Sequence, residues 1–208
     1  MNLVVLAGGR SQRMGRSKCR MELSGRPLFE YPVLALDGLC SRCIVVENER
    51  SSDSCNVPCT VVQDLVAGAG PLGGIYTGLA ASDSWLNLVV AGDMPYASPQ
   101  LAAAMEAYAL HDGLDIVYPN IDGLLEPLFA IYSKRVVSVA RALLDAGRHS
   151  VRELFAGARL RVGVVDRQFV MRYDRKLMSF FNVNTPDDLI MARLMMHVRE
   201  KSLQEECA

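Results

Sequence analysis

The sequence predicts an α/β fold, a single-domain Rossmann-like three-layer αβα sandwich with a mostly parallel central sheet. Short apolar runs alternate with helix-like segments at least four times along the 208 residues, and the connections between the runs are long enough for crossovers. The runs are continuously apolar, as expected of strands that are covered on both faces. Because no repeat or low-complexity linker divides the chain, we expect one domain over residues 1–201 and a frayed tail over residues 202–208.

Seven segments are predicted as strands, because each is short, rich in apolar residues and bounded by polar residues, glycine or proline. In chain order they span residues 3–6, 44–47, 60–63, 86–91, 115–118, 128–132 and 160–165. The fifth strand is expected to end before Pro119. In such sheets, ligands bind outside the carboxyl ends of the strands. The segments to examine for function are therefore 7–18, 64–74 and 92–95.

Proline and glycine set most of the expected helix boundaries. Pro27 suits the first position of a helix that runs to about Leu39, and Pro32 predicts a kink or a later start. A second helix is expected from Pro71 to about Ala81. The others are residues 101–110 before Gly113, 133–146 before Gly147, a short helix opened by a Ser150–Glu153 capping box, and residues 185–201 with Thr185 as N-cap.

The first predicted strand runs directly into a glycine-rich, cationic loop. Gly8 and Gly9 have no Cβ, so backbone N–H groups can approach a ligand closely there. Arg10, Arg13 and Lys18 follow, and arginine and lysine are the side chains that bind phosphate. The loop predicts a cradle for a polyphosphate. The alternative is a plain strand-to-helix turn with a solvated basic face, which the length and single charge sign of the loop disfavour.

A carboxylate follows the fourth predicted strand, in the turn Gly92-Asp93-Met94-Pro95. Facing a cationic loop, the Asp93 side chain could hold Mg²⁺ that bridges triphosphate oxygens. The alternative is an aspartate that only accepts hydrogen bonds from backbone donors within the turn.

Residues 68–73 form a literal G-x-G-x-x-G run, and Asp93 lies twenty residues further on. This pattern would suit an NAD(P)-binding oxidoreductase. We favour it less, because residues 64–67 separate the first glycine from the preceding strand and Pro71 stiffens the turn.

The composition limits the partners and the location of the protein. A net charge of −1 gives no reason to expect nucleic acid as a partner. No apolar stretch suits a signal peptide or a membrane span, so a cytoplasmic protein without membrane contact is expected. Four cysteines, Cys40, Cys43, Cys55 and Cys59, leave three alternatives open: a zinc site, disulfides, or free thiols.

The first eighteen residues carry a family resemblance. The pattern L-A-G-G-x3-R-M-G-x2-K that ends at Lys18 resembles the nucleotidyltransferases related to nucleotide-sugar transferases, and most of all the molybdenum cofactor guanylyltransferases. The segments 64–75, 92–95, 126–132 and 181–189 resemble the same family in the same order. The resemblance implies that GMP passes from Mg·GTP to the phosphate of molybdopterin with release of pyrophosphate. CTP or another phosphorylated acceptor is the alternative within this fold.

The resemblance also implies a role for each site residue. Lys18, Arg13 and Asp93 would be catalytic, and Asp93 with Asn184 would hold Mg²⁺. The nucleotide would lie against Leu6, Ala7, Gly8, Gly9, Lys18, Asp64, Gly70 and Asp93, and the acceptor against Asn182 and Arg148. From spacing alone, turn and cap chemistry is the favoured role of the two asparagines, and Arg148 could equally lie at a solvated helix end.

Two further expectations come with the resemblance. Partners would be GTP and molybdopterin, with transient contact to proteins that mature molybdoenzymes. The family also often carries a nucleotide-binding asparagine after its second strand. Here that segment reads Glu47-Asn48-Glu49, which leaves the register and the base selectivity open.

Overall fold

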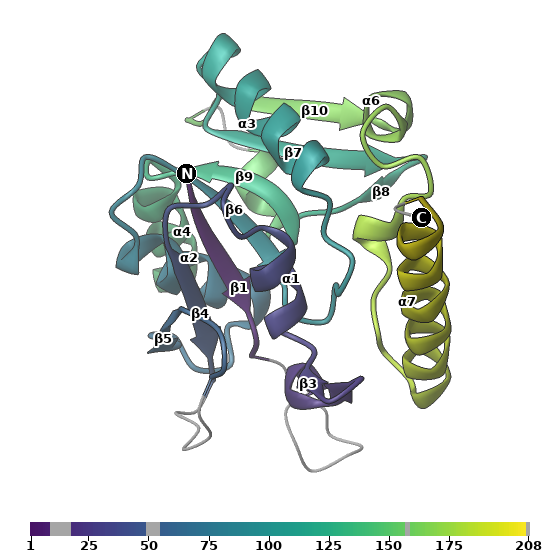
Figure 1. Cartoon of the computed structure of the whole chain (residues 1–208). Coiled ribbons are helices and arrows are strands. Elements are labelled where there is room, and N and C mark those ends of the chain that lie inside the picture. The colour runs from purple at the N-terminus through teal and green to yellow at the C-terminus, as the bar shows by residue number, and fades with distance from the viewer. Residues whose placement is uncertain (9–17, 49–54, 157–158, 207–208) are drawn as a thin grey trace.

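The computed structural model describes residues 1–8, 18–48, 55–156 and 159–206. In this part of the chain, eight strands form one central sheet in the order β10-β7-β9-β6-β1-β4-β5, with β8 paired to β7 (Figure 1). The strands are β1 (Asn2–Leu6), β4 (Cys43–Glu47), β5 (Thr60–Gln63), β6 (Leu86–Ala91), β7 (Ile116–Ile121), β8 (Leu124–Leu125), β9 (Phe129–Ser133) and β10 (Val162–Asp166). A separate two-stranded sheet pairs β2 (Glu22–Leu23) with β3 (Arg26–Pro27).

The sheet is mostly parallel, as predicted. Strand β1 is parallel to both β4 and β6, β4 is parallel to β5, and β7 is parallel to β10. Strand β9 is antiparallel to its neighbours β6 and β7. The carboxyl ends of β5, β4, β1 and β6 therefore meet along one edge of the sheet.

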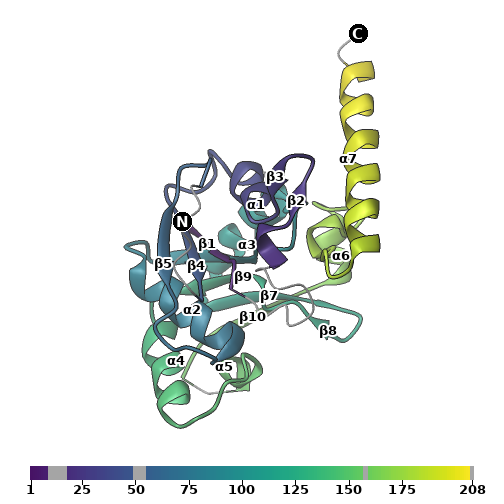
Figure 2. The same ribbon diagram turned by 90° about the horizontal axis from the view of Figure 1, so that it is seen from below.

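Helices cover both faces of the sheet (Figure 2). Seen along the sheet, α1 and α3 lie on one side, and α2, α4 and α5 lie on the other. The α-helices are α1 (Glu30–Ala35), α2 (Gly70–Ala81), α3 (Pro99–Asp112), α4 (Val136–Asp145), α5 (Arg152–Ala156), α6 (Arg167–Met171) and α7 (Pro186–Glu206), with short 3₁₀ turns η1 (Lys18–Arg20) and η2 (Met178–Phe180). The three-layer prediction is confirmed.

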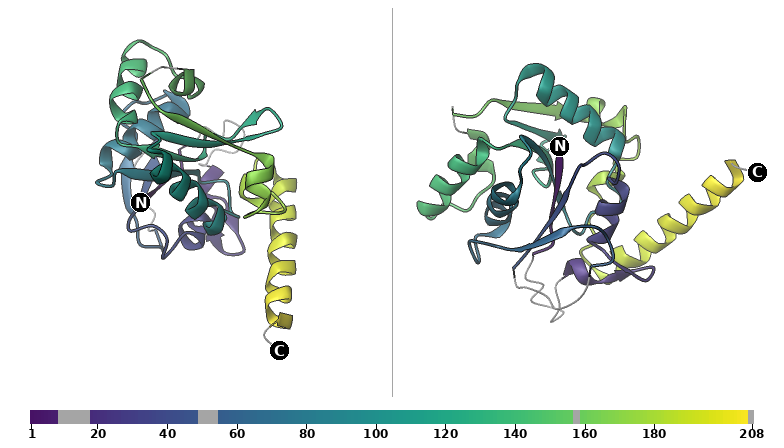
Figure 3. Two further views of the ribbon diagram at one scale, coloured as in Figure 1. Left: turned by 90° about the horizontal axis from the view of Figure 1, so that it is seen from above. Right: turned by 60° about the vertical axis from the view of Figure 1, so that its left-hand side comes forward.

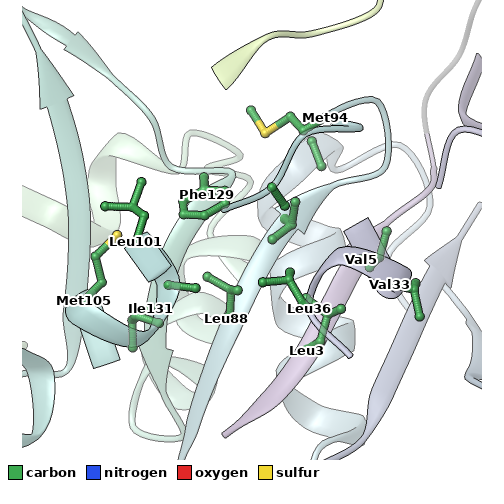
Figure 4. Packing of buried hydrophobic residues seen from close by; sticks show 14 of the residues in the cluster. Leu3, Val5, Val33, Leu36, Leu88, Met94, Leu101, Met105, Phe129 and Ile131 are labelled. Carbon is green, nitrogen blue, oxygen red and sulfur yellow. The ribbon is translucent and has the colours of Figure 1, made fainter. Parts of the chain in front are cut away.

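Two hydrophobic cores explain why the strands are continuously apolar. Alternate residues of β1 enter opposite clusters: Leu3 and Val5 pack on the α1 and α3 side, and Val4 and Leu6 pack on the α2 and α4 side. Figure 4 shows the first cluster, in which β1 and β6 side chains meet residues of α1 and α3. Because helices cover both faces of the sheet, neither face is exposed to solvent, and successive strand residues are apolar.

The first predicted helix is shorter than expected. It begins at Glu30 and ends at Ala35, so Pro32 lies in its first turn. A backbone N–H in the first turn has no acceptor within the helix, and a proline there removes nothing that the helix needs. The prediction of a later start is correct, and the predicted end near Leu39 is wrong.

Strand β7 passes through Pro119, so the predicted end of this strand is wrong. Its pairs with β9 end at Val117, and its pairs with β8 begin at Asn120. The Pro119 carbonyl accepts from the Glu126 N–H at 2.9 Å on that side of the strand. The missing N–H therefore falls in the gap between two partner strands, where a proline is tolerated.

Helix α7 begins as the sequence predicts and projects from the body of the protein (Figure 3). The Asp188 N–H donates to Thr185 Oγ1 at 3.1 Å, and the Thr185 N–H donates to Asp188 Oδ2 at 2.8 Å. This reciprocal capping satisfies two backbone donors that the helix leaves unpaired. The helix continues to Glu206, beyond the predicted end near Lys201. Within the described residues, no helix combines the length and apolar content that a membrane span requires.

Candidate functional site

The carboxyl edge of the sheet gathers the segments that the sequence analysis selected. Backbone hydrogen bonds join them pairwise across the edge. The Gly92 N–H donates to the Leu6 carbonyl at 2.9 Å, and the Ala7 N–H donates to the Val46 carbonyl at 2.9 Å. The Asp64 N–H donates to the Glu47 carbonyl at 2.7 Å. Residues that follow β1, β4, β5 and β6 therefore form one continuous rim.

Gly8 lies directly against Asn48 at this rim. A Cβ on Gly8 would lie 2.4 Å from Asn48 Oδ1 and 3.3 Å from the Asn48 backbone nitrogen, so any larger residue at position 8 would displace the Asn48 side chain. Asn48 is the first residue after β4. The structure thus places the Asn48 amide group beside Gly8, where the cationic loop begins, and makes Asn48 a further candidate site residue.

Two of the predicted triphosphate ligands, Gly9 and Arg13, lie outside the described residues, as does the side chain of Lys18. The backbone of Lys18 begins η1, and Cys19 in that turn contacts the Asp93 segment. A Cβ on Gly92 would lie 3.1 Å from Cys19 Sγ and 3.2 Å from the Leu6 carbonyl oxygen. The turn that follows the cationic loop and the turn that carries Asp93 are therefore in contact.

Asp93 is also joined to the asparagine motif near the C-terminus. The Val183 N–H donates to the Asp93 carbonyl at 2.9 Å, which places Asn182 and Asn184 on either side of this link. Asn182 Nδ2 donates to the Phe180 carbonyl at 3.2 Å, and the Asn184 N–H donates to Asp188 Oδ2 at 2.9 Å. Asp93 is partly exposed and Asn184 is exposed.

Asp93 and Asn184 are the residues here whose side-chain oxygens could take part in holding a magnesium ion together with a substrate. Mg²⁺ is usually held by one or two carboxylates together with substrate phosphates and water, not by an all-protein cage. Asp93 supplies a carboxylate and Asn184 an amide oxygen on neighbouring segments. The described residues contain no group of three or more His, Cys, Asp or Glu side chains arranged around a metal position.

Asp64 organises the glycine-rich loop that follows β5. Its Oδ1 accepts from Thr77 Oγ1 at 2.8 Å and from the Val66 N–H at 3.1 Å. The Thr77 hydroxyl in turn accepts from the Leu65 N–H at 3.0 Å. Asp64 therefore ties the loop to α2, and Thr77 is a partner that sequence reasoning missed.

The glycine run does not have the form of a dinucleotide-binding turn. Strand β5 ends at Gln63, and residues 64–67 separate it from Gly68. Gly70, with φ +63°, opens α2 in the middle of the run. In a dinucleotide-binding turn the first glycine follows the strand directly. This geometry disfavours the oxidoreductase alternative.

The residues predicted to bind the acceptor are not all gathered at the rim. Arg148 is exposed in the turn between α4 and α5 and forms an ion pair with Glu153. The segment 126–128 lies closer to the rim, because the Ala91 N–H donates to the Leu128 carbonyl at 2.9 Å, one residue before Gly92. Burial raises the pKa of Glu126 above its ordinary value.

The raised pKa of Glu126 predicts a pH-dependent stability. The folded protein binds the Glu126 proton more tightly than the unfolded chain does, so ionisation of this carboxyl disfavours the fold. The penalty is absent below the ordinary pKa of 4.5 and grows as the pH rises through the raised value. We expect Glu126→Gln to match the wild type in urea unfolding below pH 4.5 and to be more stable at neutral pH. A stability difference that does not change with pH would contradict the assignment.

Four cysteines form a partly buried cluster near the start of β4 and β5. Cys40, Cys43, Cys55 and Cys59 are free thiols, and Cys55 Sγ lies 3.0 Å from Cys59 Sγ. Burial raises the pKa of Cys40 to about 11 and that of Cys59 to about 12, so both stay protonated near neutral pH. These four described thiols do not form a group arranged around a metal, so the zinc alternative receives no support.

Comparison with known proteins places most of the chain in one family. Residues 3–162 match the family model described as the MobA-like NTP transferase domain. The chain is 34% identical over 196 residues to a probable molybdenum cofactor guanylyltransferase of Natranaerobius thermophilus, covering 93% of this chain and 95% of that protein. It is also 34% identical over 192 residues to a probable molybdenum cofactor guanylyltransferase of Pelotomaculum thermopropionicum, covering 92% and 91%.

Solved structures agree with these matches. The crystal structure of molybdopterin-guanine dinucleotide biosynthesis protein A from Archaeoglobus fulgidus superposes with a TM-score of 0.78 at 27% identity, covering 95% of this chain and 99% of that one. The 2-C-methyl-D-erythritol 4-phosphate cytidylyltransferase of Thermus thermophilus superposes with a TM-score of 0.71 at 16% identity, covering 93% and 97%. At that identity the likeness concerns the fold alone.

Proposed function

This chain belongs to the MobA-like NTP transferase family, and from that premise we propose that it transfers GMP from Mg·GTP to the phosphate of molybdopterin. The chain is a nucleotidyltransferase, and the relatives named above are called molybdenum cofactor guanylyltransferases. Those names support guanine as the base and molybdopterin as the acceptor. In the proposed reaction the acceptor phosphate attacks the α-phosphorus, and pyrophosphate leaves.

One observation carries the proposal: the motif segments meet at a single rim. Gly92 donates to Leu6, and Val183 donates to Asp93, so the end of β1, the acidic turn and the asparagine motif are neighbours. A nucleoside triphosphate bound after β1 would have its phosphates next to Asp93. The carboxyl ends of parallel strands are where such folds bind nucleotides.

The residues of this rim can be given roles within the proposal. The Gly8 and Gly9 amides, Arg13 and Lys18 would hold the triphosphate, and the nucleoside would lie against Leu6, Ala7, Asp64 and Gly70. Asp93 and Asn184 would hold Mg²⁺, which supplies charge neutralisation to the phosphate oxygens when it is bound. Asn182 and Arg148 would place the acceptor.

The proposed chemistry needs no general base. A phosphomonoester is already an anion near neutral pH, so its oxygen can attack without losing a proton to a side chain. What the chain must supply is alignment of the two substrates and neutralisation of the charge that develops on the leaving pyrophosphate. The cations of the loop, and the turn at Asp93 that backbone hydrogen bonds join to the neighbouring segments, suit that task.

Pyrophosphate release with each of the four NTPs, with and without molybdopterin, tests the proposal. We expect release that depends on both GTP and molybdopterin. Release with CTP, or with another phosphorylated acceptor and not with molybdopterin, would assign a different substrate to the same site. GTP binding without pyrophosphate release under any acceptor would indicate a nucleotide-binding regulator and contradict the proposal.

A further inference from the structure

A buried ion pair joins the turn after the cationic loop to the end of β4. Arg20 Nε and Arg20 Nη2 both donate to Glu47 Oε1, at 3.1 Å and 2.7 Å. The Arg20 side chain is 15% exposed and the Glu47 side chain 6% exposed. The Arg20 guanidinium also lies over the Phe29 ring, 5.5 Å from its centroid. Two donors on one oxygen and an aromatic face fix the guanidinium in one orientation.

Glu47 is the last residue of β4 and lies next to several segments of the rim. Its backbone carbonyl accepts from the Asp64 N–H at 2.7 Å, and the next residue, Asn48, lies against Gly8. Its side chain reaches η1, the turn that begins at Lys18. Glu47 thus contacts the segment that follows β5 and the turn that follows the cationic loop, and its neighbour Asn48 contacts Gly8 after β1.

The fold does not depend on this pair for its register. Strand β4 is held between β1 and β5 by backbone hydrogen bonds that involve no side chain. The Glu47 carbonyl keeps its bond to Asp64 whatever side chain is present. Turn η1 has a separate anchor, because the Phe29 N–H donates to the Cys19 carbonyl at 3.0 Å. What the pair adds is a fixed position of η1 relative to Asn48.

The burial of the Arg20–Glu47 pair supports a positioning role over a stabilising one. A buried ion pair rarely stabilises a protein more than well-packed apolar side chains of the same size would, and removing one partner strands a buried charge. The second Glu47 oxygen, Oε2, is buried and has no hydrogen-bond partner among the described residues. A pair that offers little stability and sits between nucleotide-binding segments is better explained by geometry than by folding.

We propose that Arg20 and Glu47 are positioning residues for nucleotide transfer, which hold the turn Lys18–Arg20 in the place that triphosphate binding requires. The inference rests on the proposed function. Neither residue touches the substrate in this proposal; both act through Lys18. Misplacement of a binding group by about 1 Å can lower catalysis ~10²-fold.

The test separates positioning from folding by comparing single and double variants. Arg20→Met leaves Glu47 buried without its cation, so we expect a lower thermal midpoint and a kcat/KM for GTP reduced ~10- to 100-fold. The double variant Arg20→Met with Glu47→Met removes both charges. We expect its thermal midpoint to return to within ~3 °C of the wild type, while kcat/KM for GTP stays low.

Arg141→Gln with Asp145→Asn is the matched control. This pair joins Arg141 Nε to an Asp145 oxygen at 2.9 Å on the exposed surface of α4. Its loss should change neither the midpoint nor kcat/KM for GTP, because exposed pairs contribute little. Arg20→Lys keeps the charge without the two-donor fork, and we expect an intermediate kcat/KM.

Either of two outcomes would overturn the inference. If the double variant recovers activity together with stability, the pair is only structural. If Arg20→Met leaves kcat/KM for GTP unchanged, the pair positions nothing.

Titration calorimetry with Mg·GTP distinguishes this failure from failure of the proposed function. Suppose that the wild type shows no molybdopterin-dependent turnover but binds GTP, and that the double variant does not bind GTP. That result would support the positioning role of Arg20 and Glu47 and reject molybdopterin as the acceptor. Wild-type protein that binds no nucleoside triphosphate would reject both.

Discussion

Replacing Asp93 by alanine is expected to lower the rate of nucleotide transfer ~10²-fold or more, on the scale of a lost group that stabilises developing charge. The side chain is partly exposed at the end of β6, where a bound triphosphate would meet it. Two contacts of this turn are backbone bonds, Gly92 to Leu6 and Val183 to Asp93, and these remain in the variant because they do not involve the Asp93 side chain. The turnover number at saturating GTP, acceptor and Mg²⁺ is the measurement.

Asp122→Ala is the control for Asp93→Ala. Asp122 is an exposed carboxylate in the turn between β7 and β8, where it forms an ion pair with Arg167 at 2.7 Å. It lies beyond β9 from the nucleotide rim, so its loss should leave turnover unchanged. Transfer by Asp93→Ala at the rate of the wild type would remove Asp93 from the proposed metal site. A thermal midpoint close to that of the wild type would show that lost turnover is not lost folding.

The sheet could be predicted because its strands carry their signal locally. The predicted segments 60–63 and 86–91 match β5 and β6 at both ends. Both are short, rich in β-branched or apolar residues and bounded by turn-forming residues. The two-residue strands β2, β3 and β8 have no periodicity to detect, and their existence depends on pairing with a distant or neighbouring strand. The helix α6, five residues long, was missed for the same reason.

That the candidate segments meet at one edge was predictable because of a general property of parallel sheets. Once Gly8, Asp64 and Asp93 were placed after strands, the shared direction of those strands brought them to one edge. Local sequence could not reveal which partners those residues have. Thr77 lies 13 positions after Asp64 and donates a hydrogen bond to it, and Arg20 lies 27 positions before Glu47. Such contacts follow from tertiary packing and leave no spacing pattern.

A large loss of stability is expected from a substitution in the core beside the site, at Phe129. This side chain begins β9, is fully buried and belongs to the cluster drawn in Figure 4. Replacing it by alanine removes a buried ring and leaves a cavity, so we expect the free energy of unfolding to fall by ~3–5 kcal/mol. Urea unfolding measures the loss. Leu124→Ala, at a side chain that is 68% exposed, should change the same quantity by less than ~0.5 kcal/mol.

Phe129 also connects the core to the asparagine motif, which gives this prediction a second part. Its ring meets Phe180 edge to face, with centroids 5.7 Å apart and planes at 75°. Phe180 ends η2, and its carbonyl accepts from Asn182 Nδ2. A double-mutant cycle of Phe129→Ala and Phe180→Ala should give a coupling of ~0.5–1.5 kcal/mol. If the two losses simply add, the aromatic contact does not join the sheet to the acceptor side, and the order of residues 180–184 must come from the backbone link between Val183 and Asp93 instead.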